Sequence, residues 1–157
     1  MKHWDRGLTV GISAGLAGGI AEVAWIWTYA AVTHADAGVV ARAVSDTVGL
    51  SAQGLSPVAA GVGIHMSLAA ILGMAVAFAL RPARGRMHGF GLFAAVTSAL
   101  ALVWAVNFMV VLPLVNPAFV SIVPLGVSFI SKLLFGVAAA STLLLAQPAT
   151  LRLAAHR

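Results

Sequence analysis

The chain has 157 residues, of which 61% are hydrophobic and only 8% are charged. A soluble globular domain is usually about 45–50% apolar and about 25% charged. The composition therefore excludes an ordinary soluble fold and predicts an integral membrane protein. The net charge of +5 does not indicate a nucleic-acid partner, because the basic residues lie in short segments that flank apolar runs. The absence of cysteine excludes disulfides and thiolate metal sites.

Four apolar runs reach the length of about 20 residues that a helix needs to span a bilayer. They cover residues 8–32, 57–80, 89–112 and 122–146. With short connections they fill almost the whole chain, so we predict one all-α domain, residues 1–157, folded as a four-transmembrane-helix bundle. The first run is too long for the apolar region of a signal peptide, so we expect it to remain in the mature protein.

The basic residues predict the orientation. They fall at the N-terminus, in the link between the second and third runs, and at the C-terminus: Lys2, Arg6, Arg81, Arg84, Arg86, Arg152 and Arg157. The other two links contain only Arg42. By the positive-inside rule, both termini and the link at 81–88 are cytoplasmic. We therefore expect a multi-pass protein of a bacterial-type inner (plasma) membrane, with the lipid bilayer as its first partner.

The first outer link, residues 33–56, has a helical pattern of its own. Its valines and alanines recur at helical spacing, and Arg42 and Asp46 form an i,i+4 pair. Asp36 suits the N-terminal end of such a helix, and Gly49 suits its C-terminal end. We predict a short amphipathic helix, which either lies on the outer membrane face or packs on the outer end of the bundle.

Each predicted span carries a polar residue on a row of small residues spaced four apart. These residues are Glu22, His65, Asn107 and Lys132. Helices in lipid associate through small residues and polar contacts, so we expect all four side chains to point into the bundle. At ~1.5 Å per residue, Glu22 and Lys132 lie roughly 16 Å below the outer ends of their spans, His65 roughly 12 Å and Asn107 roughly 9 Å. An unpaired charge at such depth is costly, so we predict that Glu22 and Lys132 pair.

Four glycines in the first span recur every four residues: Gly7, Gly11, Gly15 and Gly19. We call them the glycine stripe. Such a stripe lets another backbone approach closely, and its partner is either another span or another protein.

The sequence offers little chemistry beyond these polar residues. No nucleophile–His–acid set is present, so we expect no enzyme activity and no metal site. Haem ligation through His65 is disfavoured. A bis-histidine site needs a second histidine at the same depth, and no other histidine lies within a predicted span. We therefore predict a non-enzymatic small membrane subunit of a larger membrane complex or homo-oligomer, with the polar cluster fixing helix packing. The alternative is a small proton, ion or polar-solute transporter that uses Glu22, His65 and Lys132.

Four segments together resemble a group of poorly characterised four-span bacterial inner-membrane proteins. They are the first-span stretch "GISAGLAGGIAE", the second-span stretch "GIHMSLAAILG", the third-span ending "NFMVVLP" and the last-span stretch "SKLLFGV". The resemblance implies a four-helix membrane fold and no particular activity. This chain has Lys132 where the last span of that group more often carries histidine.

The orientation can be tested by introducing single cysteines, because the chain has none of its own. In intact cells, an impermeant thiol reagent should label Ala37→Cys and Ala118→Cys. The same reagent should not reach Gly85→Cys or Ala155→Cys, which we place in the cytoplasm. Labelling at position 85 from outside would contradict the predicted orientation.

Overall fold

The computed structural model of the chain describes residues 2–49, 56–81, 87 and 89–147, with side chains in the first helix from Gly7 onward. Regular structure in these residues is helical throughout. Four helices are long and apolar enough to cross a membrane: Gly7–Thr33, Pro57–Ala79, Phe90–Val115 and Leu125–Leu145. The described part of the chain is therefore all-helical, and its four long apolar helices indicate a multi-pass membrane protein. Arg84, Arg86, Arg152 and Arg157, on which the predicted orientation partly rests, lie outside the described residues.

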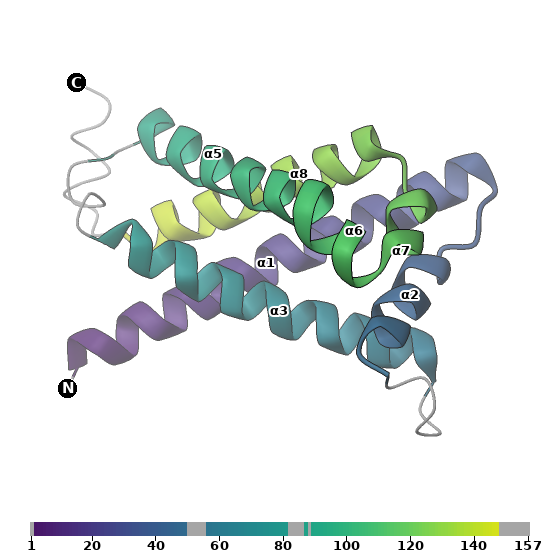
Figure 1. The fold of residues 1–157 in the computed structure, drawn as a ribbon. Helices are drawn as coiled ribbons and strands as arrows, with labels where there is room; N and C mark the ends of the chain where they lie inside the picture. Colours follow the sequence, from purple (N-terminus) through teal and green to yellow (C-terminus); the bar gives the residue numbers. More distant parts are fainter. Residues whose placement is uncertain (1, 50–55, 82–86, 88, 148–157) are drawn as a thin grey trace.

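Figure 1 shows the order of the helices along the chain. They are α1 (Lys2–Thr33), α2 (Val39–Thr47), α3 (Pro57–Ala79), α5 (Phe90–Val106), the π-helix η2 (Asn107–Val111), α6 (Leu112–Val115), α7 (Pro117–Ile122) and α8 (Leu125–Leu145). The third span consists of α5, η2 and α6 in succession, and it extends beyond the predicted end at residue 112.

Proline and capping residues account for several helix boundaries. Pro57 begins α3, and the Ser56 hydroxyl accepts a hydrogen bond from the N–H of Ala59. Pro117 begins α7 in the same way, with the Asn116 side chain accepting from the N–H of Phe119 at 3.2 Å. Pro113 lies just after the π-helix. Because proline cannot donate the backbone bond of a regular turn, the helix widens on its N-terminal side instead of breaking.

A helix does form in the first long link, but its ion pair differs from the predicted one. Arg42 pairs with Asp36, and the exposed Asp46 is not its partner. The reason is that long helical side chains lean toward the helix N-terminus, where Asp36 lies. Asp36 also accepts a hydrogen bond from the N–H of Gly38. The Arg42 guanidinium, together with this backbone bond, holds the pKa of the Asp36 carboxyl below its ordinary value.

The glycine stripe packs against α3 of the same chain. A Cβ on Gly15 would collide with the backbone of Ala69 and Ala70, and a Cβ on Gly73 would collide with the backbone of Gly15. Gly11 and Gly19 also face α3, whereas no described residue lies within 4 Å of the position a Cβ on Gly7 would take. The partner of the stripe is therefore another span, and the stripe carries no evidence for a second protein.

The α5–α8 contact uses large side chains instead of small ones. Leu92, Val96 and Leu100 of α5 are fully buried in the core. We had expected this contact to be made by the row of residues spaced four apart that runs from Gly91 to Asn107, but Gly91 and Asn107 are both exposed. Bulky residues face inward here because α8 supplies the small ones, as where Gly136 receives Thr97 of α5.

The four spans are arranged as an open arc in the order α3, α1, α8, α5. Helix α1 packs against both α3 and α8, and α5 packs against α8. A short link joins the second and third spans, and such a link usually makes two helices antiparallel neighbours. Among the described residues, however, α3 and α5 share no extensive contact. Short links bring span ends together, but they do not determine which helix faces match.

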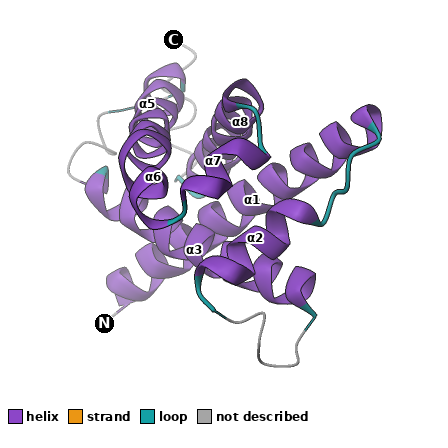
Figure 2. Ribbon diagram, turned by 45° about the vertical axis from the view of Figure 1, so that its right-hand side comes forward, coloured by secondary structure: helices purple, strands orange, loops and turns teal. Residues whose placement is uncertain are grey.

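One end of the open side of the arc is covered by short helices. Figure 1 shows α2, α6 and α7 gathered at the end of the bundle away from the N-terminus, and Figure 2 shows them beside one another. Helix α2 packs against α3 and α7. The Asn116 side chain donates a hydrogen bond to the Thr47 hydroxyl at 2.9 Å, which ties α2 to the junction of α6 and α7.

The glycine contact predicts a sharp difference between two matched substitutions. Gly15→Leu should lower the thermal unfolding temperature in detergent, because the leucine side chain has to push α1 away from α3. Overpacking of this kind costs ~1–3 kcal/mol and sometimes more. Gly7→Leu, on the same face but in open space, serves as the control and should leave the melting temperature close to that of the wild type. Equal melting temperatures for both variants would contradict the α1–α3 packing.

Candidate functional site

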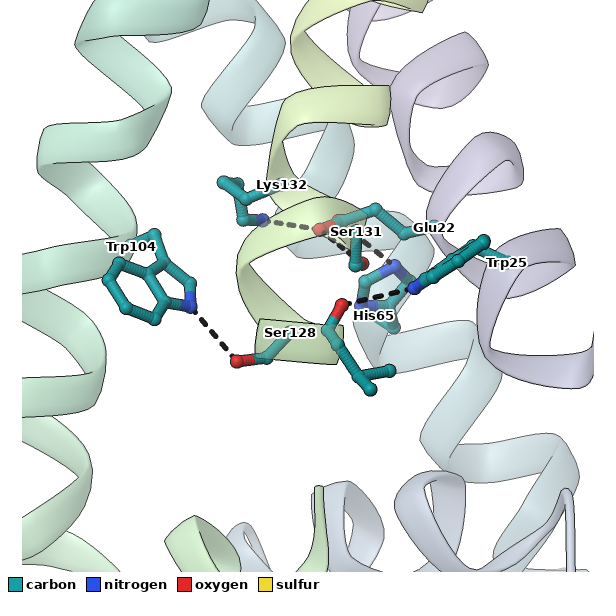
Figure 3. A network of polar contacts seen from close by, with 8 residues as sticks. Glu22, Trp25, His65, Trp104, Ser128, Ser131 and Lys132 are labelled. Atoms are coloured by element: carbon teal, nitrogen blue, oxygen red, sulfur yellow. Dashed lines mark hydrogen bonds and ion pairs between the residues drawn. The ribbon is translucent and has the colours of Figure 1, made fainter. Parts of the chain in front are cut away.

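Three ionisable side chains from three helices meet inside the bundle. Lys132 of α8 places its Nζ 2.8 Å from Oε1 of Glu22 on α1. The Nε2 atom of His65 on α3 lies 3.6 Å from the other carboxylate oxygen, Oε2. We call these three residues the ionic cluster (Figure 3). The ion pair expected between Glu22 and Lys132 is present.

Neighbouring groups hold the ionic cluster in place. The Ser131 hydroxyl donates a hydrogen bond to Glu22 Oε1 at 3.1 Å, so two consecutive residues of α8 bind the same oxygen. The Lys132 ammonium also lies 4.9 Å from the centre of the Phe135 ring, within the range of a cation–π interaction. Phe135 itself is buried against Gly18 of α1, which has no side chain to displace it. The absence of a side chain at Gly18 thus lets the ring support the lysine.

The cluster contains two buried polar atoms that lack a hydrogen bond. Glu22 Oε2 and His65 Nε2 have no hydrogen-bond partner among the described residues. The two atoms face each other, but their separation of 3.6 Å is too long for a hydrogen bond. A buried polar group without a partner costs roughly 1–3 kcal/mol. A small movement, or a proton on the imidazole, would close this separation into a charge-assisted bond.

A cavity of about 440 Å³ occupies the open side of the arc. All three members of the ionic cluster line it, together with residues of α2, α5, η2, α6 and α7. Most of its wall is apolar, and the ionic cluster provides the charged part of that wall. Ligand sites in proteins typically have volumes of about 300–1,000 Å³ and combine apolar walls with a few convergent polar groups. The cavity matches that description.

Aromatic side chains form the wall on the α5 side. The Trp104 ring stacks on Phe108 with 5.6 Å between centroids, and Phe108 meets Phe119 of α7 at 6.5 Å. The Trp104 Nε1–H donates to the Ser128 hydroxyl at 3.1 Å, which fixes the ring against α8 (Figure 3). These contacts create a continuous aromatic surface that faces the cavity.

Asn107 does not join the ionic cluster. It lines the cavity from the first position of the π-helix and is exposed. The expected depths placed His65 between Asn107 and the Glu22–Lys132 pair, but the imidazole reaches Glu22 itself. His65 can contact Glu22 because side chains reach several ångströms along a helix axis. A depth counted from the rise per residue does not include this reach.

Several polar partners were not predicted. The contacts of Ser131 and Ser128 could not be predicted, because hydroxyls are common in apolar helices, where most of them bond to their own backbone. The Trp25 Nε1–H donates to the carbonyl of Val127 at 3.0 Å and ties α1 to α8. The one feature of the sequence that pointed to Ser131 was its position next to Lys132. Two adjacent residues of a helix can both reach the same carboxylate, as they do at Glu22.

The described residues contain no group of three or more His, Cys, Asp or Glu side chains that could hold a metal ion. No family model, curated protein or solved structure matches the chain. The site must therefore be interpreted from its own geometry.

The ion pair predicts a non-additive double-mutant cycle. Glu22→Gln and Lys132→Met should each lower the unfolding temperature, because each leaves a buried charge without its partner. Breaking a buried pair costs ~3–5 kcal/mol in soluble proteins. The double variant should recover much of this loss, since neither charge remains. Thermal unfolding of the three variants in one detergent measures the coupling, and losses that simply add would contradict it.

Proposed function

We propose that this protein is a small membrane transporter that conducts protons along a membrane potential, in which the ionic cluster is the site of proton and solute binding. The observation that supports the proposal best is the position of Glu22, His65 and Lys132 in the wall of a cavity of about 440 Å³. Ionisable residues deep in a membrane helix are rare and commonly mark the path of an ion, a proton or a solute. A cluster that served only packing would not need a cavity beside it.

The charges of the cluster suit proton movement. With His65 neutral, Glu22 and Lys132 compensate each other in a site of low dielectric constant. A proton on His65 would add a positive charge next to Glu22 Oε2, which has no hydrogen bond in its present position. The imidazole can therefore gain a proton beside the Glu22 carboxylate, which gives the cluster a net charge of +1, and release it again.

We place the protein in a bacterial-type inner membrane with both termini in the cytoplasm. In that orientation, α2, α6 and α7 lie on the outer side, and the cavity beneath them receives its solute from outside. The hydrogen bond between Asn116 and Thr47 would then join the two halves of the outer cover. This orientation rests on the distribution of basic residues.

A non-enzymatic subunit of a larger complex, or of a homo-oligomer, is the second candidate. The observation in its favour is the exposed apolar surface of the third span, where Leu102 is 66% and Leu114 80% exposed. Lipid covers such a surface equally well. The glycine stripe no longer favours this candidate, because it packs within the chain. Co-migration with other subunits after mild detergent extraction would support it.

Proton movement in proteoliposomes tests the transporter. An imposed membrane potential should drive protons through the wild-type protein, as measured by a pH-sensitive dye inside the vesicles. Glu22→Gln should abolish this movement, because it removes the carboxylate that faces His65.

The matched control is Asp46→Asn. It makes the same chemical change at an exposed carboxylate on α2 that does not line the cavity. This variant should conduct like the wild type. Wild-type vesicles that move no more protons than empty ones, or a Glu22→Gln variant that remains fully active, would contradict the proposal.

A further inference from the structure

The cavity is much larger than a path for protons alone requires. Proton transfer needs a chain of polar groups or waters, whereas most of the lining here consists of valine, leucine, isoleucine and aromatic side chains. A cavity of about 440 Å³ with such walls has the size and composition of a site for an organic molecule. The part of the ligand that faces these walls has to be apolar, because the walls offer it few hydrogen bonds.

The aromatic wall defines the shape of the apolar part. Trp104, Phe108 and Phe119 present one surface, in which neighbouring rings are 5.6 Å and 6.5 Å apart. Aromatic rings pack best against other flat rings, in offset or edge-to-face arrangements. A flat molecule with one or two rings therefore fits this wall better than a flexible acyl chain.

The head group of the ligand follows from the donor capacity of Lys132. Its ammonium carries three N–H donors, and its contacts among the described residues are with Glu22 and with the Phe135 ring. The lysine side chain is 17% exposed, whereas that of Glu22 is 7% exposed. Glu22 Oε2 and His65 Nε2 are buried. Of the three cluster residues, Lys132 is thus the one with spare hydrogen-bond donors for a molecule in the cavity, and such a molecule needs an oxygen that accepts a hydrogen bond.

We propose that the cavity binds a flat, apolar ring compound with one hydrogen-bond-accepting oxygen, a carbonyl or a carboxylate, which bonds to Lys132 while the rings lie against Trp104 and Phe108. The identification of this compound as the transported solute rests on the proposed function, but its binding does not. Figure 3 shows the two sides of the site, with Lys132 on α8 and the Trp104 ring beside it on α5.

A carbonyl and a carboxylate differ in the proton that accompanies them. A neutral carbonyl leaves the compensated pair of Glu22 and Lys132 unchanged. A carboxylate adds a negative charge to a poorly solvated site, so a proton on His65 has to accompany it. The charged groups that face His65 are Glu22 from α1 and Lys132 from α8. On α2, which also packs against α3, Arg42 is paired with Asp36, and Asp46 is exposed.

Tryptophan fluorescence offers a direct binding assay, because Trp27 and Trp104 line the cavity. The purified full-length protein in maltoside micelles is titrated with 2-acetylnaphthalene, 2-naphthoate and naphthalene. We expect saturable quenching by one or both of the oxygen-bearing probes. Naphthalene should bind roughly tenfold to a hundredfold more weakly, the factor expected for one hydrogen bond to a charged group. Naphthoate affinity that falls with rising pH identifies the carboxylate, and pH-independent acetylnaphthalene binding identifies the carbonyl.

Substitutions at the lysine test the head group. The Glu22→Gln/Lys132→Met double variant leaves no orphaned charge, so it tests the loss of the lysine in a protein that should remain folded. It should bind the oxygen-bearing probes no more tightly than naphthalene. Lys132→Arg, which keeps the donors, should retain the preference for oxygen. If all three probes bind the wild type equally, or if the double variant keeps the preference, the assignment of Lys132 is wrong.

A second pair of variants tests the cavity itself. Val103→Phe fills the cavity from its α5 wall and should abolish saturable quenching by every probe. Leu102→Phe, at the neighbouring position, adds the same side chain to a residue that is 66% exposed and does not line the cavity. It should bind like the wild type. Quenching that never saturates, or that is equal in the two variants, means that the probes partition only into detergent or lipid, and it overturns the proposal.

The two proposals fail separately. Saturable probe binding without proton movement removes the transport function but keeps the ligand class. Proton movement through a protein that binds none of the probes keeps the transport function but removes the ligand class.

Discussion

Glu22 brings a carboxylate into the middle of an apolar helix, and three helices are arranged around it. A charge in that position costs from about 3 to more than 10 kcal/mol unless it is compensated. Lys132 and Ser131 of α8 supply that compensation on one oxygen, and His65 of α3 lies beside the other. The carboxylate thereby fixes how α1, α3 and α8 can be rotated about their axes. Rotation of any one of them would leave a polar atom facing hydrocarbon.

The close packing of the same helices follows from this constraint. Side chains of ordinary length can meet at Glu22 only if the helix backbones are near each other. Gly15 and Gly73 allow that approach between α1 and α3, and Gly18 allows it between α1 and α8 by receiving Phe135. The small residues and the buried charge thus determine the packing of these helices together. The glycines set the distance between the backbones, and the charges set their rotation.

Much of this arrangement was predictable from the sequence, and the parts that were not have physical causes. The spans follow from the length of the apolar runs, and the Glu22–Lys132 pair follows because each is the one residue of its charge within a span. The order of the helices did not follow, because link length says which ends are near but not which faces match. The inward face of α5 was predicted wrongly, because large residues make the contact where the partner helix supplies the small ones. Here Gly136 supplies the space on α8, so α5 presents Leu92, Val96 and Leu100.

The open arc has two joints of unequal stiffness. Between α1 and α3, backbone meets backbone at Gly15 and Gly73, so few rotatable side chains at that point can absorb a displacement. Between α5 and α8, the contact is made by leucine and valine side chains, which can change rotamer as the helices slide past each other. The π-helix and Pro113 add a weak point farther along the same span, where the regular backbone ladder is already interrupted. The α1–α3 pair is therefore the more rigid side of the arc, and the third span is the side that can shift relative to it.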